Sequence, residues 1–334
     1  DRLESRASRT IAPVRSILLV TFPFFALVLA GYVAARRRML PLEAIPGLNG
    51  FVLFFALPCM LYRFGASTPI AQLLDARVFL TWLLCALVVV ALVVWLGLKR
   101  RLGWNDAAFG ALVGAFPNTG FMGVPLLVAL LGAQAAGPVI VTMVIDMVIT
   151  TSLCIALSRL DGADAHGFAH AGRNALRGVL LNPMPWAIGL GALASAVQLA
   201  LPAPVLKTVG LLSDAASPVA LFTIGAVLAR SQMLAALHDH APVPRMDYVP
   251  VALIKLLLHP LLVLGVTAAA GAAGWPLDPL ARTVLVLAAA LPSASNVSLL
   301  AERFGADNGR IARIILVSTA AAFLTFAGAV AWMT

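Results

Sequence analysis

Two short stretches of this chain place proline and small polar residues inside long apolar runs. They read GAFPNTGFMGVP at 114–125 and ALPSASNVSLLA at 290–301. A proline inside a helix removes one backbone donor and opens the helix, and the helix that restarts after it presents N–H groups with a partial positive charge. Such N–H groups, with amide and hydroxyl side chains beside them, suit an anion. We therefore predict a site for an anionic substrate formed by Pro117, Asn118, Thr119, Pro292, Ser293, Ser295 and Asn296.

A single proline of this kind has a simpler interpretation, because proline and glycine are common in transmembrane helices and kink them. The matched pair favours a binding site, since each proline is followed closely by an asparagine, Asn118 or Asn296. Backbone groups freed in lipid cost several kcal/mol each, by order of magnitude, unless protein or water satisfies them. The two breaks are therefore expected to be buried in protein or to line a wet cavity.

Two ionisable residues fall inside apolar runs and are candidates for coupling or charge pairing. Asp146 suits proton or cation coupling, or a structural acid hydrogen-bonded to a neighbouring helix, and the sequence leaves both open. Lys255 suits neutralisation of an anionic substrate or pairing with Asp146; the alternative is a lysine that snorkels to the interface. His259 shares a helix face with Lys255 and is more simply interpreted as a packing residue.

The elements that position these residues must be membrane-spanning helices. The chain is 61% hydrophobic and 11% charged, with a mean hydropathy of +0.99, and apolar runs long enough to cross a bilayer recur along it. We predict an all-α integral membrane protein with ten spans and short loops. The spans are 16–35, 48–66, 78–98, 106–131, 136–158, 184–201, 205–229, 249–272, 281–301 and 311–333.

The net charge of +9 points to membrane topology rather than to nucleic acid, because the basic residues gather at span ends. With both termini outside, the inner loops hold most of them, including the clusters at 36–38 and 99–101. The outer loops hold only Arg63, Arg77, Lys207 and Arg282. The arginine-rich tail at 1–15 is the one segment whose charge opposes this orientation. Cys59, Cys85 and Cys154 fall in spans and indicate neither a disulfide framework nor a metal site.

A polar link divides the chain into two halves of five spans. We predict a first repeat at 1–160, a cytoplasmic linker at 161–183 and a second repeat at 184–334. Repeats with an odd number of spans enter the membrane from opposite sides, so related halves are inverted. The proline-broken spans are the fourth of each half, and broken helices in corresponding positions indicate a binding site near the membrane midplane.

Several stretches resemble the auxin efflux carrier family. FPNTGFMGVPLL (116–127) is similar to that family's fourth span, LNGFVLFFALPCMLYRFGAS (48–67) to its second and ALPSASNVSLLAERFG (290–305) to its ninth. LLNPMPWAIGLGAL (180–193), ALFTIGAVLA (220–229) and ALIKLLLHPLL (252–262) follow in the family's order. The resemblance covers nearly the whole chain, and its fourth-span motif is the most specific.

The resemblance implies a homodimeric ten-helix carrier in which spans 4 and 9 are broken and cross. It implies an elevator-like division into a scaffold (spans 1, 2, 6 and 7) and a moving core (spans 3–5 and 8–10). Bacterial members move acids such as malonate or malate, plant members an indole carboxylate, and Asn118 with the backbone around Pro117 and Pro292 would line the site. The stretch RVFLTWLLCAL (77–87) lacks the Asp and Lys of the plant third span, and the link between the halves is short, so auxin is a poor candidate.

We therefore expect a secondary transporter of small organic anions in a bacterial inner membrane, driven by a gradient of H⁺ or Na⁺ and without another cofactor. A sodium-coupled symporter of the bile acid type is the first alternative; an intramembrane enzyme and a channel are the others. No P-loop, HExxH, GxSxG or Rossmann motif occurs, so neither ATP-driven transport nor catalysis is indicated. Histidines at 166, 170, 238 and 240 have weak metal spacing and are interpreted as solvated loop residues.

Overall fold

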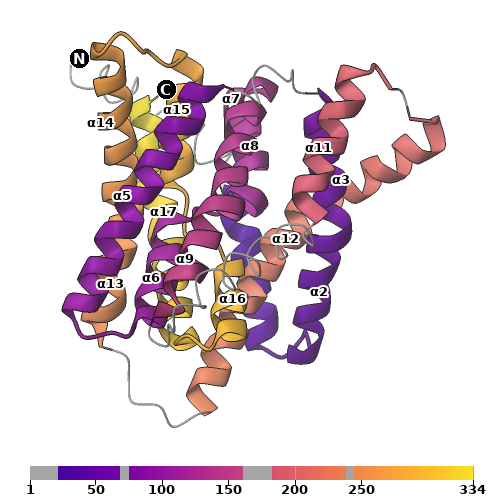
Figure 1. Ribbon diagram of the computed structural model, residues 1–334. Helices are drawn as coiled ribbons and strands as arrows, with labels where there is room; N and C mark the ends of the chain where they lie inside the picture. The colour runs from indigo at the N-terminus through magenta and orange to yellow at the C-terminus, as the bar shows by residue number, and fades with distance from the viewer. Residues whose placement is uncertain (1–21, 68–74, 161–182, 200, 238–243, 334) are drawn as a thin grey trace, which may run out of the picture.

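The computed structural model describes residues 22–67, 75–160, 183–199, 201–237 and 244–333. Within these ranges the regular structure is helical throughout (Figure 1). Six helices are long and apolar enough to cross a membrane: Leu42–Ser67, Ala76–Lys99, Ala133–Leu157, Ala203–Arg230, Arg245–Ala272 and Asn308–Met333. Four shorter apolar helices accompany them: Phe22–Arg36, Thr119–Leu131, Trp186–Ala196 and Pro279–Ala290. The prediction of an all-helical membrane protein is confirmed.

The helices form two groups. The first, here the small bundle, lies on the right in Figure 1. It contains the helix Phe22–Arg36, the continuous run η1 (Leu42–Ala44), α2 (Ile45–Phe51), η2 (Val52–Ala56) and α3 (Leu57–Ser67), and α11 (Pro183–Ala196) and α12 (Ala203–Leu237). The helix α3 packs against both α11 and α12.

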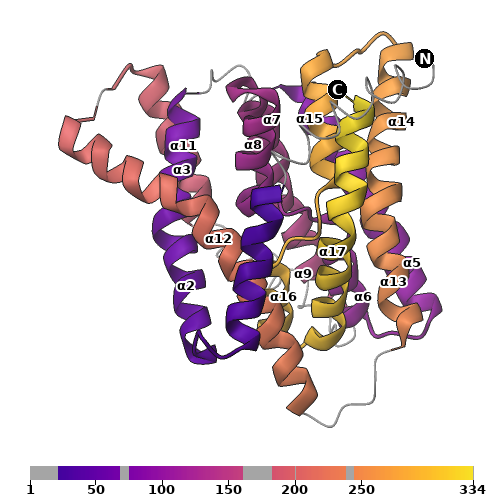
Figure 2. The same ribbon diagram turned by 180° about the vertical axis from the view of Figure 1, so that it is seen from behind.

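Glycines bring the small-bundle backbones into direct contact. A Cβ at Gly31 or Gly225 would fall on the carbonyl of the facing helix, at Phe222 or Val28. Gly191 on α11 meets the Tyr62 carbonyl of α3 in the same way. Small residues at helix crossings let helices approach closely in a membrane. The small bundle is therefore tightly packed, and Figure 2 shows the helix Phe22–Arg36 (indigo) lying beside α12.

The second group, here the large bundle, holds both proline-broken stretches. Its first part is α5 (Ala76–Lys99), α6 (Trp104–Ala115), η3 (Thr119–Gly123), α7 (Val124–Leu131), η4 (Ala133–Ala135), α8 (Ala136–Ile145), η5 (Asp146–Thr150) and α9 (Thr151–Leu157). Its second part is α13 (Arg245–Leu253), η7 (Ile254–Leu258), α14 (His259–Ala272), α15 (Pro279–Ala290), α16 (Asn296–Phe304) and α17 (Asn308–Met333). The two bundles meet where α12 contacts η3 and α17.

Four of these elements, η2, η3, η5 and η7, are π-helical turns. Such turns are rare and often occur at functional sites. Asp146 begins η5 and Lys255 lies in η7, so both predicted ionisable residues are in π-helical turns.

The helix α12 is longer than the predicted span at 205–229, since it begins at Ala203 and ends at Leu237 with Pro218 inside it. The part beyond the predicted span, RSQMLAAL at 230–237, consists mostly of residues that favour helix. The apolar part long enough to cross a membrane ends at Arg230, within one residue of the predicted end.

Candidate functional site

The two proline-broken stretches pair with each other through their backbones. Pro117 and Ser293 form an isolated antiparallel bridge. The N–H of Asn118 donates to the carbonyl oxygen of Pro292 at 2.8 Å, and the N–H of Ala294 donates to that of Phe116 at 2.9 Å. Each break therefore satisfies backbone groups that the other leaves free, which is the requirement for a broken helix inside a membrane protein.

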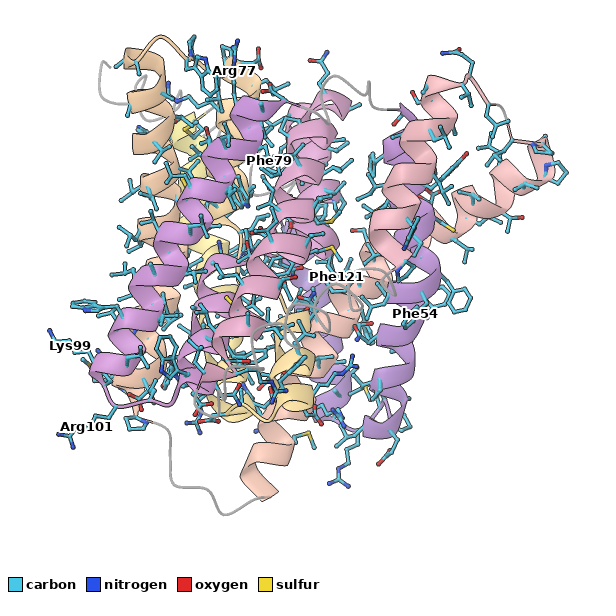
Figure 3. The ribbon with its side chains drawn as sticks, viewed as in Figure 1. Phe54, Arg77, Phe79, Lys99, Arg101 and Phe121 are labelled. Atoms are coloured by element: carbon cyan, nitrogen blue, oxygen red, sulfur yellow. The ribbon has the colours of Figure 1, made fainter. Side chains whose placement is uncertain are left out.

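The residues before the prolines end the incoming helices. Phe116 has φ −90° and ψ 104°, and Leu291 has φ −62° and ψ 154°, both extended. A residue before proline is pushed out of the helical region by the proline ring, so α6 and α15 stop there. The chain restarts as η3–α7 on one side and as α16 on the other (Figure 1). Two helix N-termini therefore begin at one crossing point, and Phe121 in η3 lies midway between the ends of the molecule (Figure 3).

The predicted polar side chains are brought together at this crossing. Asn118, Thr119, Ser293 and Ser295 are buried, and Asn296 is half-buried. The Oγ of Ser293 and the Oδ1 of Asn296 are buried and make no hydrogen bond to the described residues. Buried polar atoms are nearly always paired, so these two atoms leave hydrogen-bonding capacity at the crossing.

A small cavity joins the crossing to the small bundle. Its volume is about 10 Å³, which is space for the centre of roughly one water molecule. Ser295 and Phe121 line it from the large bundle, and Asn49 and Thr223 line it from the small bundle. Sequence reasoning missed Asn49 and Thr223, although each is a polar residue in an apolar run.

A larger cleft opens between α3, α12 and the start of α7. It has a volume of about 600 Å³, and Pro125 of α7 lines its large-bundle side. Arg63 and Asp214, also in its lining, form an ion pair with 2.7 Å between Nη1 and Oδ1. Ser213 accepts a hydrogen bond from the same guanidinium group at 3.1 Å.

The two predicted ionisable residues lie in one buried cluster. Asp146 is fully buried, and its carboxylate accepts hydrogen bonds from Trp82 Nε1 and Thr150 Oγ1, both at 3.1 Å. Lys255 is also fully buried, so it does not snorkel to the interface. Its Nζ donates to the carbonyl oxygen of Ala289 at 2.7 Å and lies 3.2 Å from His259 Nδ1.

The position of Lys255 follows from the break in α15. In a continuous helix the Ala289 carbonyl would accept from the N–H of Ser293. That N–H donates instead to the Oγ of Ser318 on α17 at 3.2 Å. The lysine therefore binds a carbonyl that the break sets free, at the negative end of the α15 dipole. Sequence reasoning gave neither Ala289 nor Ser318, because both depend on tertiary contacts.

Among the described residues no group of three or more His, Cys, Asp or Glu side chains could hold a metal ion. The three cysteines are free thiols. The histidines at 166, 170, 238 and 240 lie outside the described residues.

Comparison with known proteins identifies the family of this chain. The model of the family described as membrane transport protein matches residues 17–330. The chain is 30% identical over 311 residues to a Rhizobium meliloti (strain 1021) protein named "Putative malonate transporter", covering 92% of this chain and 93% of that protein. It is 27% identical over 288 residues to the "Uncharacterized transporter YfdV" of Escherichia coli (strain K12), covering 84% and 86%. It is 26% identical over 153 residues to "Auxin efflux carrier component 7" of Arabidopsis thaliana, covering 44% and 24%.

Proposed function

This chain belongs to the membrane transport protein family that includes auxin efflux carriers, and from that premise we propose that it carries small carboxylates across the membrane. Membership shows a multi-pass membrane transporter, which confirms the predicted transport role and the expectation that the chain is not an enzyme. The relative named for malonate supports a carboxylate as the substrate.

The observation that carries the proposal is the crossing itself. Two helix N-termini, of η3–α7 and of α16, begin at one buried point where Asn118 and Pro292 are hydrogen-bonded. Some N–H groups there already donate to local carbonyl oxygens, such as that of Thr119 to Pro117 and that of Val297 to Ala294. The partial positive charge of the two helix N-termini remains, so together they favour a carboxylate. The hydroxyl of Ser293, which is buried without a partner among the described residues, adds a donor.

Each predicted site residue then has a defined role. Pro117 and Pro292 hold the breaks open, and the amide of Asn118 donates to the substrate carboxylate. The remaining donors are the hydroxyl groups and the second amide of the crossing, on Thr119, Ser293, Ser295 and Asn296.

The proposed transport cycle moves the large bundle against the small bundle. In this scheme the ten spans form two inverted repeats, the small bundle is the scaffold, and the large bundle is the core that carries the crossing. The glycine contacts of the small bundle support a rigid scaffold. The cleft of about 600 Å³ on one side, against about 10 Å³ at the crossing, supports access from one side at a time. A homodimer completes the scheme, and the mass of the detergent-solubilised protein by light scattering tests it.

Purified protein in liposomes tests the function directly. We expect saturable uptake of labelled malonate or malate, with counterflow when the lumen is preloaded with the same acid. A channel would give uptake without counterflow. Absence of movement of malonate, malate and indole acetate in both directions would overturn the proposal.

Sodium-coupled symport is the second candidate, and one observation favours it. The oxygens Ser293 Oγ and Asn296 Oδ1 lie three residues apart in the second break and are buried without partners among the described residues, and Na⁺ takes oxygen ligands. This candidate predicts that uptake is lost when sodium is replaced by choline. Equal uptake in the two salts would exclude it.

A further inference from the structure

The buried polar cluster beside the crossing is not explained by substrate binding alone. We define it as Trp82 on α5, Asp146 at the start of η5, Lys255 in η7 and His259 at the start of α14; all four side chains are fully buried. Charged groups inside a membrane protein are costly and usually mark ion or proton pathways. The cluster needs an explanation that uses both its carboxylate and its amine.

Asp146 and Lys255 are close enough to interact electrostatically, but no ion pair within 4.0 Å joins them. Each has neutral partners instead. Trp82 and Thr150 bind the carboxylate, and Ala289 and His259 bind the amine. Because no direct ion pair joins the two groups, the number of protons bound to them can change while these neutral contacts persist.

The cluster is linked to the crossing through one hydrogen bond. Lys255 Nζ binds the Ala289 carbonyl, and Pro292, three residues further on, accepts the N–H of Asn118. The lysine therefore touches the helix end that leads directly into the proposed substrate site. A charge on this lysine acts on an anion at the crossing through a low-dielectric interior, where electrostatic interactions are strong.

Of the other titratable groups on the surrounding helices, Cys154 on α9 is near enough to Asp146 to interact with its charge. Asp106 on α6 and Asp247 on α13 belong to a separate network around Arg310 of α17. The described parts of α8 and α14 contain no charged residue other than His259. The members of the Arg310 network are Arg100, Asp106, Asp247, Asp307 and Arg310.

We propose that Asp146 binds one proton with each transported carboxylate, and that this proton frees the charge of Lys255 to neutralise the anion. In the empty state Asp146 and Lys255 share a single exchangeable proton and the pair is neutral. When the anion docks, a proton from the aqueous phase on that side forms an O–H bond on Asp146 and Lys255 stays an ammonium group, so the pair and one carboxylate group together have no net charge; the second carboxylate of a diacid such as malonate keeps its own charge. On the other side the anion and the proton leave together.

This proposal rests on the proposed carboxylate transport and adds the coupling ion. Linkage requires reciprocity: if protonation tightens binding of the anion, binding of the anion must promote protonation. His259 and Trp82 act as positioning residues, because Trp82 binds the carboxylate, His259 lies 3.2 Å from the amine, and their ring centroids are 5.2 Å apart.

The test is malonate-driven proton movement in liposomes that hold a pH dye. We expect an inward malonate gradient to acidify the lumen for the wild type. Asp146→Asn resembles the protonated acid, so labelled malonate counterflow should persist while acidification falls at least about tenfold. Glu302→Gln removes an exposed carboxylate on α16 and should leave acidification unchanged.

Lys255→Met provides a second test, because loss of the counter-charge should weaken malonate binding at every pH. Where that variant fails to fold, the double variant Asp146→Asn/Lys255→Met, which leaves no unpaired charge, replaces it and should show weak, pH-independent binding. Counterflow by the wild type without proton movement would overturn the coupling and leave carboxylate transport standing. Undiminished acidification by Asp146→Asn would also overturn it. No movement of any carboxylate by the wild type would instead refute the proposed function.

Discussion

The N–H of Asn118 donates to the carbonyl oxygen of Pro292 at 2.8 Å, so two stretches far apart in the sequence meet at one crossing. This bond uses only the backbone of Asn118, and its side chain is free for another role. The substitution Asn118→Ala should therefore keep the crossing and remove only a donor to the substrate.

We expect Asn118→Ala to weaken malonate binding by about 10- to 100-fold, the effect of losing a hydrogen bond to a charged group. The measurement is the malonate Kd in detergent, with the melting temperature as a check on folding. Gln134→Ala, which removes an exposed amide, is the matched control. A Kd for Asn118→Ala within twofold of the wild type would remove this side chain from the site.

Pro292→Ala should let α15 continue past Ala290 and close the break. We expect malonate uptake to fall by about tenfold or more, because a continuous helix would take the Pro292 carbonyl and the Ala294 N–H away from Asn118 and Phe116. Removing the proline relieves a helix interruption that costs about 3 kcal/mol and offsets the two lost bonds, so the melting temperature should show a folded protein. Pro279 stands at the first turn of the same helix, where proline is tolerated, so Pro279→Ala should transport normally. Equal loss of uptake in Pro292→Ala and Pro279→Ala would show that malonate uptake does not depend on the helix break.

The packing of α11 on α3 offers a matched pair of glycines. A Cβ at Gly191 would fall on the Tyr62 carbonyl, whereas nothing lies within 4 Å of a Cβ at Gly189. Gly191→Ala should destabilise the protein by about 1–3 kcal/mol through overpacking. Gly189→Ala should be neutral or slightly stabilising, since alanine favours helix. Thermal unfolding in detergent compares the two, and equal midpoints would contradict the close contact.

The two ends of α5 test the predicted topology, because Arg77 and Lys99 lie at opposite ends of the molecule (Figure 3). In a background without Cys59, Cys85 and Cys154, Arg77→Cys should react with a membrane-impermeant maleimide in intact cells. Lys99→Cys should react only after permeabilisation. The reverse pattern would place both termini inside the cell.

Much of this site follows from local sequence signals. Proline inside an apolar run predicts a broken helix wherever it occurs, so the breaks at Pro117 and Pro292 could be located without a structure. A carboxylate or an amine in such a run, such as Asp146 or Lys255, stands out in the same way.

The partners of these residues could not be predicted, because they depend on tertiary packing. Nothing local distinguishes Trp82, which binds Asp146, from other aromatic residues. Asn49, Thr223 and Ser318 are lone polar residues on apolar helices, and most such residues hydrogen-bond to their own helix. The predicted span at 205–229 agrees with the apolar part of α12, but hydropathy describes the membrane and does not show that the helix continues to Leu237.

The π-helical turns have a consequence for how this site can vary. Each holds one more residue than an α-helical turn, so loss of a single residue within η5 or η7 would restore an α-helical turn and leave the flanking helix in phase. Side chains inside the turn, Asp146 or Lys255 among them, would still change direction, whereas a deletion elsewhere in the helix would rotate everything after it by about 100°. In this protein the direction in which its buried charges point is therefore a matter of segment length as much as of composition.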